Sequence, residues 1–258
     1  MSDAKHTLLP LLPTTSALTF GTYTLKSGRQ SPYFFNSSLL YTASLHHAVC
    51  SAYASVLTSP PFTSKPQSQY SSSSTLSESS NPTPIPIPTY DVLFGPAYKG
   101  IVLSGSILPF LLLQAQHTTN PTTISPFHSI SYAYNRKEPK PHGEGGSLVG
   151  CPVKDKRVVI VDDVITAGTA IREAVNLIRE EGGIVVGVVV LLDRQGRGGE
   201  EEPRSALGVA SEELGVPVKA VIRFEDLIGA VEEGRIPGAG EEELRRMKEY
   251  RERYRSRD

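Results

Sequence analysis

The chain has 258 residues, a formal net charge of −1 and a pI near 6.6. A chain of this length can bury a substantial hydrophobic core, as one large domain or as a domain with additions. The nearly balanced charge argues against a general nucleic-acid binder, which normally carries a strongly positive surface.

Cysteine spacing and the N-terminal stretch exclude further classes. Cys50 and Cys151 lie far apart with no CxxC pattern, so a disulfide scaffold or a zinc site is not expected. Pro10 and Pro13 interrupt the apolar start, which therefore lacks the continuous run of a signal peptide. The longest apolar run, 184–192, is too short to cross a bilayer. We expect a cytoplasmic protein that does not enter the membrane.

The first informative segment is residues 25–36, LKSGRQSPYFFN, in which aromatic residues follow two cations. A planar heterocycle can stack on Phe34 or Phe35, while the other ring belongs to the core. Lys26 and Arg29 then indicate that this ligand, or its neighbour, is anionic. An ordinary core position for both rings is the alternative.

Residues 59–89 are dominated by Ser, Pro and Thr and contain too little apolar surface to pack. We expect a disordered or loosely extended surface insertion here. An inert loop extension is favoured over a regulatory tether that is phosphorylated.

A strand at 91–94 leads into GPAYKG, residues 95–100, and then into an apolar helix. Small residues let the backbone approach a ligand closely, and Lys99 adds a mobile positive charge. At the mouth of a parallel sheet this combination suits a pyrophosphate. A plain turn with a surface lysine is the alternative.

Residues 134–146, YNRKEPKPHGEGG, concentrate cations among prolines and glycines. The composition predicts an irregular catalytic loop at about 134–147. Such a loop can exclude water from a reactive intermediate and neutralise a departing pyrophosphate. A solvated surface loop is the bland alternative.

Residues 158–170, VVIVDDVITAGTA, are the most informative stretch. A strand of four β-branched residues ends in Asp162 and Asp163, and a short turn then leads into a helix. A turn of this kind gathers free backbone N–H groups and a helix N-terminus around one spot, which favours phosphate. The acids can hold ribose hydroxyls and, through water or the sugar, Mg²⁺. Simple capping of the helix is the alternative, but a cap needs one side chain close to the helix start.

The rest of the chain alternates strands and helices. Ile171, Ala174, Val175 and Ile178 mark the apolar face of a helix that ends at 182–183. Strands are expected at 184–192 and 218–222, and a solvated helix at 241–258. Together these elements predict a doubly wound α/β fold with a mostly parallel sheet.

Arg194 follows the long apolar strand and lies on the same rim as the two acids. Its guanidinium can pair with a carboxylate or carbonyl of a planar ligand. A salt bridge to Asp193 or Glu200 is the alternative.

The acidic strand-turn-helix resembles the signature of type I phosphoribosyltransferases, which use phosphoribosyl pyrophosphate (PRPP). The resemblance runs from about residue 20 through the C-terminal helix, and its other motifs select the orotate phosphoribosyltransferase branch. Those motifs are LKSGRQSPYFFN, FGPAYKGI, YNRKEPKPHGEGG and LLDRQGRG. It implies the type I fold in a single domain, 1–258, with a small N-terminal hood at about 1–45.

The resemblance also implies residue roles. The positions matching PRPP-binding residues are Lys26, Tyr98, Lys99, Arg136, Lys137, Lys140, His142, Asp162, Asp163, Val164, Ile165, Thr166, Ala167, Gly168, Thr169 and Ala170. The positions matching orotate-binding residues are Lys26, Phe34, Phe35, Thr166 and Arg194. The positions expected to act in catalysis are Lys99, Lys140, His142, Asp162 and Asp163.

The implied reaction transfers the 5-phosphoribosyl group of PRPP to orotate, giving orotidine 5′-monophosphate and pyrophosphate in pyrimidine (UMP) synthesis. The resemblance also implies Mg²⁺, held through PRPP and water near the acids, and a homodimer whose catalytic loop reaches the neighbouring site. Two alternatives remain: a phosphoribosyltransferase for another base, and a PRPP-binding regulator without catalysis.

Overall fold

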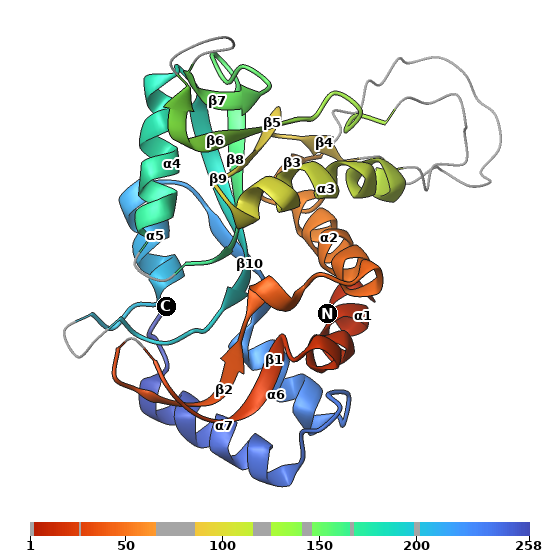
Figure 1. Ribbon diagram of the computed structural model, residues 1–258, viewed down its shortest axis with the longest axis vertical. Helices are drawn as coiled ribbons and strands as arrows, with labels where there is room; N and C mark the ends of the chain where they lie inside the picture. Colours follow the sequence, from red (N-terminus) through yellow and green to blue (C-terminus); the bar gives the residue numbers. More distant parts are fainter. Residues whose placement is uncertain are drawn as a thin grey trace, which may run out of the picture.

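The computed structural model describes residues 3–25, 27–65, 86–115, 125–140, 146–165, 168–198 and 202–258. Its centre is a six-stranded sheet of order β10-β9-β8-β5-β6-β7 (Figure 1). The strands are β5 (Val92–Gly95), β6 (Ser131–Lys140), β7 (Gly146–Gly150), β8 (Arg157–Val164), β9 (Ile184–Asp193) and β10 (Val218–Arg223). Every neighbouring pair is parallel except β6 and β7. The predicted α/β fold with a mostly parallel sheet is confirmed.

The strand order reverses between β5 and β8. From β5 the chain proceeds to β6 on one side, and later to β8, β9 and β10 on the other. In open α/β sheets such a reversal leaves a crevice at the carboxyl ends of the two strands, where ligands bind. The topology therefore places the segments after β5 and after β8 beside one another.

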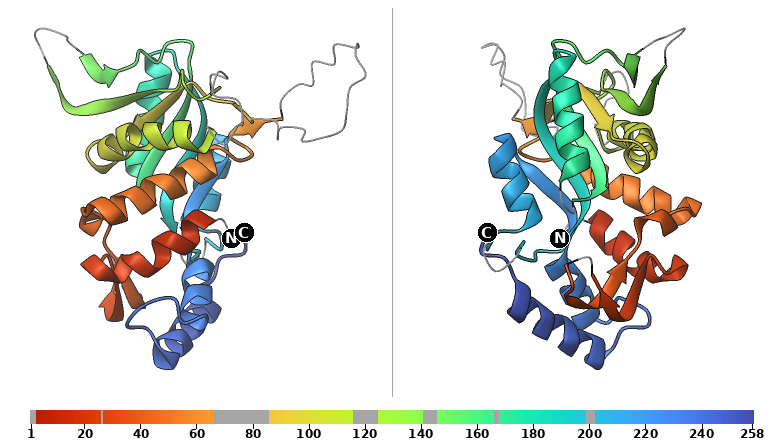
Figure 2. Two further views of the ribbon diagram at one scale, coloured as in Figure 1. Left: turned by 90° about the vertical axis from the view of Figure 1, so that its right-hand side faces the viewer. Right: turned by 60° about the vertical axis from the view of Figure 1, so that its left-hand side comes forward.

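Helices cover both faces of the sheet (Figures 1 and 2). Val159 and Val161 of β8 pack in one core with α2 (Ala43–Leu57) and α3 (Lys99–Ala115). Val158 and Ile160 point to the opposite core, which contains α4 (Thr169–Glu180) and α5 (Ala206–Leu214). This alternation explains why β8 is apolar throughout, because both of its faces are buried. Within the described ranges, no helix has the length and apolar character needed to span a membrane.

The N-terminal segment forms a separate layer at one end of the sheet. It contains α1 (Asp3–Leu8), the 3-10 helix η1 (Leu9–Thr15), the hairpin β1 (Leu18–Thr24) and β2 (Gln30–Phe35), and η2 (Ser37–Leu39). Two C-terminal helices pack against it, α6 (Phe224–Glu232) and α7 (Glu241–Tyr254). Tyr33 stacks on Phe224 with ring centroids 4.9 Å apart, and Lys5 pairs with Asp226 at 2.8 Å. Both ends of the chain therefore build this layer, as Figure 1 shows.

The helix predicted from apolar spacing is confirmed as α4. Ile171, Ala174, Val175 and Ile178 are all buried along one side. Gly182 follows in the left-handed region with φ of 77°, a conformation that glycine adopts without strain. The predicted terminal helix is also present, although it ends at Tyr254 rather than Asp258.

The predicted bounds of the Ser/Pro-rich insertion, 59–89, are too wide. β3 (Thr63–Ser64) pairs antiparallel with β4 (Ile87–Pro88), and Phe62 is fully buried. Phe62 packs against β9, where a Cβ on Gly187 would lie 2.5 Å from its ring. The burial of Phe62 therefore explains why the two ends of this segment are ordered, which their Ser/Pro-rich composition does not indicate. Residues 66–85, the centre of the predicted insertion, lie outside the described residues.

The prediction that 134–146 contains no regular element is also wrong. Residues 131–140 form β6, and residues 146–150 form β7, which pairs with it antiparallel at the edge of the sheet. Only residues 131–134 of β6 pair with β5, so the charged half of β6 pairs with β7 alone and tolerates charges and proline as an edge does. Within the predicted catalytic loop, 134–147, only 141–145 lies outside the described residues.

Candidate active site

The two predicted acids lie at the carboxyl end of β8, beside the segment that follows β5. Asp162 and Asp163 are each 8% exposed. The Asp163 carboxylate accepts hydrogen bonds from Lys99 Nζ at 2.8 Å and from the Ser37 hydroxyl. Lys99 Nζ also donates to Ser37 Oγ at 2.7 Å. Segments after β5, after β8 and after the N-terminal hairpin thus converge on one carboxylate.

The alternative that these acids cap a helix fails. α4 begins at Thr169, its N-cap is Gly168, and among the described residues no side chain caps its N-terminus. The carboxylates instead face Lys99 and Ser37. An uncapped helix start offers its first N–H groups to an anion.

The pKa values of the two carboxyl groups are shifted in opposite directions. Burial, together with the charge of Asp163, raises the pKa of Asp162 to about 7. Burial acts on Asp163 as well, but hydrogen bonds from Lys99 and Ser37 hold its pKa below the usual range. Asp163 is therefore ionised at neutral pH, while Asp162 titrates near it. Neighbouring acids with separated pKa values are typical of functional sites.

The backbone around the acids is held firmly. The Tyr53 hydroxyl, fully buried in α2, donates to the carbonyl oxygen of Asp162 at 2.6 Å. The backbone N–H of Asp163 donates to Asp162 Oδ1 at 2.9 Å. These contacts fix the end of β8, so the carboxylates keep their position without a ligand.

The turn after β5 requires glycine at two positions. A Cβ on Gly95 would lie 1.9 Å from the carbonyl oxygen of Gly100, and a Cβ on Gly100 would meet Pro96. The N–H of Ala97 donates to Asn135 Oδ1 at 2.8 Å, which ties this turn to β6. The tight turn presents Lys99 to Asp163 and leaves Tyr98 72% exposed.

The phosphate-loop prediction is only partly inside the described residues. Val164 and Ile165 are half-buried, and Gly168 is left-handed with φ of 73°. Thr169 and Ala170 begin α4. Thr166 and Ala167 lie outside the described residues.

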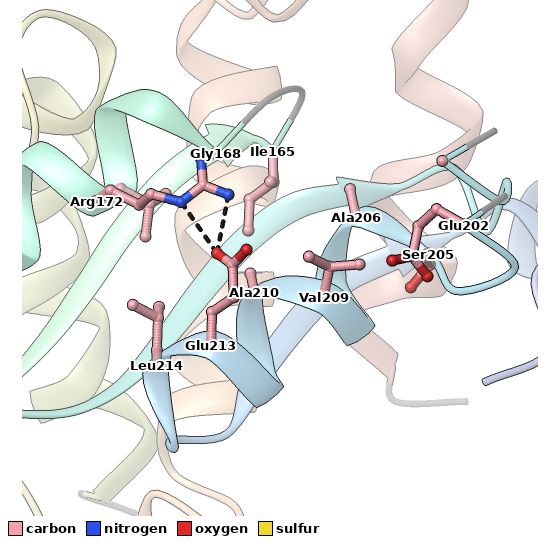
Figure 3. A pocket seen from close by; sticks show the side chains of 12 residues that line it. Ile165, Gly168, Arg172, Glu202, Ser205, Ala206, Val209, Ala210, Glu213 and Leu214 are labelled. Atoms are coloured by element: carbon pink, nitrogen blue, oxygen red, sulfur yellow. Dashed lines mark hydrogen bonds and ion pairs between the residues drawn. The ribbon is translucent and has the colours of Figure 1, made fainter.

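The Arg172 guanidinium lies beside Gly168, the N-cap of α4. Its guanidinium would be 3.4 Å from a Cβ on Gly168, and it pairs with Glu213 of α5 at 2.8 Å. Figure 3 shows this pair spanning a cavity of about 180 Å³ between α4 and α5. Arg172 therefore places positive charge beside the turn that is predicted to hold phosphate.

We predict that Arg172→Met raises KM for PRPP about fivefold while kcat changes by less than about twofold. The reason is that a cation behind the phosphate turn serves the bound ground state and the transition state equally. Steady-state kinetics with varied PRPP measures this. Arg179→Met, at the exposed far end of the same helix, is the matched control and should behave like the parent. A fall in kcat with unchanged KM contradicts the assignment.

Of the two phenylalanines, one is core and one is accessible. Phe35 is 6% exposed, whereas Phe34 is 41% exposed and lies 5.4 Å from the Tyr23 ring. This division agrees with the expectation that one ring packs and the other is free to stack. Lys26, which precedes them in the same motif, lies outside the described residues.

Arg194 follows β9 and is half-buried. It forms no ion pair with any residue in the described ranges, and Asp193 instead accepts the N–H of Gln195 at 2.8 Å. Glu200, the other partner considered, lies outside those ranges. Burial raises the pKa of Tyr250, and the nearby charges of Arg29 and Arg194 oppose that rise. The described ranges therefore show no salt bridge to Asp193, and the ligand role of Arg194 stays a prediction.

The β6–β7 hairpin carries the predicted loop cations. Arg136 donates across the hairpin to the carbonyl oxygens of Gly146 and Leu148, and Lys137 Nζ lies 5.9 Å from the centre of the Tyr98 ring. Among the described contacts, none joins Arg136 or Lys137 to the two acids. Lys140 ends β6, but its side chain is not described, and His142 lies outside the described residues.

Sequence reasoning missed several side chains that complete the site. Ser37 and His46 line a cavity of about 360 Å³ together with Lys99 and Asp163. Ser37 immediately follows the motif LKSGRQSPYFFN, so a longer reading of that motif could have included it. Tyr53 and Asn135 act through contacts between distant segments and leave no local signal.

Three comparisons with known proteins agree. A model of the phosphoribosyl transferase domain matches residues 86–221. An orotate phosphoribosyltransferase from Coccidioides immitis is 50% identical, covering 98% of this chain and 96% of the relative. One from Stenotrophomonas maltophilia is 41% identical, with coverages of 88% and 87%. A crystal structure of the Francisella tularensis enzyme has a TM-score of 0.70 at 31% identity, covering 95% and 98% of the two chains. The chain therefore belongs to the orotate phosphoribosyltransferase family.

Proposed function

We propose that this chain transfers the 5-phosphoribosyl group from PRPP to orotate, with release of pyrophosphate and orotidine 5′-monophosphate in pyrimidine synthesis. The observation that carries the proposal is the convergence of Lys99, Ser37 and the acid pair at the sheet reversal. The turn predicted to hold phosphate follows the acids in the sequence. Phe34 is accessible, and Arg194 has no ion pair among the described residues, so both could contact a planar anion. We assign the acid pair, Lys99 and Ser37 to the activated sugar, and Phe34 and Arg194 to its acceptor.

The chemistry follows from where charge develops. As the bond from ribose C1 to pyrophosphate lengthens, the leaving group gains negative charge and the sugar gains positive charge. Lys99 and the cations of the β6–β7 hairpin stabilise the leaving group, and Asp162 and Asp163 hold the ribose hydroxyls. Lys99 would then exchange its contact with Asp163 for the pyrophosphate, which frees the carboxylate for the sugar.

We propose Mg²⁺ as the cofactor. Asp162 and Asp163 are hard oxygen ligands, and Mg²⁺ is usually held by one or two carboxylates with substrate phosphates and water. In the described residues no cluster of three or more His, Cys, Asp or Glu side chains forms a protein-only cage. The ion would neutralise charge on the pyrophosphate, and it would be bound chiefly through PRPP.

The decisive experiment measures pyrophosphate release with PRPP and a panel of bases. We expect release with orotate and Mg²⁺, and little with uracil or a purine. Arg194 and Lys26 suit an acidic base, which is why we expect orotate to be preferred. Preference for another base would favour the alternative transferase. Tight PRPP binding without release would favour a regulator. Chelation of divalent ions should abolish turnover, and retained turnover would refute the Mg²⁺ proposal.

We also propose a homodimer in which the β6–β7 loop of one subunit completes the other subunit's site. Exposed apolar side chains support it, because a large apolar patch on a protein surface marks an interaction site. Those on α3, on β6 and on the segments before α3 and α2 are Tyr41, Tyr98, Val102, Leu113 and Tyr132. A second copy covering this surface would bring its own hairpin beside the acids. A cytoplasmic location is proposed with it, on the basis of two free thiols.

The shared site predicts complementation between two inactive variants. Lys140→Ala and Asp163→Asn, mixed after subunit exchange, should recover about a quarter of parent activity, because half the dimers are mixed and each holds one intact site. Activity of the separate and mixed variants measures this. If each loop serves its own subunit, mixing restores nothing.

A further inference from the structure

A second basic cleft lies away from the acid pair, between the β1–β2 hairpin and α7. Its volume is about 420 Å³. In Figure 1 these two elements lie side by side at the end of the molecule remote from β7. The charged and aromatic residues that line the cleft are Arg29, Arg246, Glu249, Tyr250, Arg253 and Tyr254.

The cations of α7 divide according to the face on which they lie. Arg245, Lys248 and Arg251, which do not line the cleft, pair with glutamates at 2.5 to 3.6 Å. Arg246 and Arg253, which do line it, form no ion pair with any residue in the described ranges.

The arginine that the hairpin contributes and the one acid in the lining fit the same pattern: the arginines of the cleft lack acidic partners among the described residues. Arg29, across the cleft, likewise has no acidic partner among the described residues. The only acid in the lining, Glu249, is engaged by Arg245 at 2.5 Å. The cleft therefore has an excess of positive charge that the described protein leaves unneutralised.

Neutral contacts hold two of these guanidinium groups in place. Arg246 donates to the carbonyl oxygen of Gly21 at 2.8 Å and to Thr22 Oγ1 at 2.6 Å. Arg29 donates to the carbonyl oxygen of Arg197 at 2.6 Å and lies 5.0 Å from the centre of the Tyr254 ring. A guanidinium has five N–H groups, so each retains donors for a ligand. Because these two side chains are already partly immobilised, binding a ligand costs less side-chain conformational entropy.

We propose that this cleft binds a small phosphate-bearing anion of nucleoside monophosphate size. Three guanidinium groups against one engaged carboxylate suit a multiply charged anion, and planar guanidinium forks match phosphate oxygens. Arg253 also lies over the Tyr254 ring, 5.3 Å from its centre. Tyr254 therefore contacts both Arg29 and Arg253. None of the lining residues belongs to the acid-pair site. The cleft is therefore distinct from the acid-pair cavity, although it shares Arg29 with the hairpin motif that is expected to contact the planar anion.

A fluorescent reporter tests the proposal, because the chain contains no tryptophan. Tyr254→Trp introduces a single indole into the cleft and preserves the aromatic contact with both arginines. Its emission is titrated with inorganic phosphate and with adenosine 5′-monophosphate. Sodium chloride of matched ionic strength controls for screening. We expect saturable changes with both probes, tighter for the nucleotide, and none with chloride.

Variants in the reporter background locate the response. Arg246→Ala combined with Arg253→Ala should weaken binding at least about tenfold, since two charge-assisted hydrogen bonds are lost. Arg253→Ala alone, at an exposed side chain, should weaken it about threefold or more and guards against misfolding of the double variant. Lys248→Ala, which removes one charge as Arg253→Ala does but lies outside the cleft, should leave the affinity unchanged.

Asp163→Asn, in the acid-pair site, should also leave the probe affinity unchanged. If neither probe gives a saturable response, the proposal is overturned. Equal affinity in the double variant also overturns it, as does loss of the response in Asp163→Asn, which would place the probe in the acid-pair site. Orotate turnover is measured separately, so failure here does not bear on the enzymatic proposal.

Discussion

Asp162→Asn is expected to make the ligand-free protein more stable at pH 8, by roughly 2–4 kcal/mol, because it removes the cost of ionising a buried carboxyl group. Burial and the charge of Asp163 raise the pKa of Asp162 from 3.8 to about 7. A carboxyl whose pKa is raised by folding binds its proton more tightly in the folded state. Stability is therefore lost as pH rises from the unfolded pKa through the folded one.

The advantage of the amide should be small near pH 4, should grow toward pH 7 and should be complete above it. Denaturant unfolding of parent and variant at several pH values measures this. Asn retains an Oδ1 that can accept the N–H of Asp163, so the local geometry is preserved. A pH-independent difference, or a destabilised variant at pH 8, contradicts the expected ionisation.

Asp163→Asn is the matched control, and it should not stabilise the protein. Hydrogen bonds from Lys99 and Ser37 hold the pKa of Asp163 below its usual range despite burial, so its charge favours folding at neutral pH. The contrast matters for function, since Asp162→Asn should also weaken PRPP binding about tenfold through loss of a charged acceptor. If Asp162→Asn makes the protein more stable but weakens PRPP binding, the carboxylate costs folding stability and is kept because it binds the ligand.

The sequence was sufficient where local pattern and tertiary environment agree. The run 158–161 is apolar on every residue because β8 is buried on both faces, and the spacing at 171–178 matches the face of α4 that packs on it. The sequence therefore predicts that the acids and Gly168 lie between these two elements. The rim position of Lys99 followed from the same logic, because β5 and β8 are parallel neighbours.

Prediction failed where a distant contact decides the structure. Phe62 orders the stem of the insertion by packing on β9, which no local composition indicates. β6 contains Pro139 and several cations that a fully central strand would reject, but only its first four residues pair with β5, so the charged half pairs with β7 alone. The separation of the two aspartate pKa values depends on Ser37 and Lys99, which come from remote segments. These are features of tertiary contact, and their local sequences carry no sign of them.

Lys140→Ala is expected to lower kcat about 100-fold or more while changing PRPP affinity by less than about threefold, because its charge acts on the departing pyrophosphate. Lys140 ends β6 opposite Gly146, where the hairpin leaves the sheet. A cation there can approach the site when the hairpin closes, and it meets the greatest negative charge as the bond breaks. Single-turnover rates and equilibrium PRPP binding separate the two effects.

Lys156→Ala, just before β8 at the opposite end of the sheet, is the control for a general loss of positive charge and should match the parent. Equal losses in kcat and affinity for Lys140→Ala would indicate ordinary ground-state binding, and no loss would remove the hairpin from catalysis. The predicted split follows from the site's arrangement: groups fixed at the sheet, such as Asp163, bind PRPP, whereas cations on the edge hairpin meet it only as it reacts.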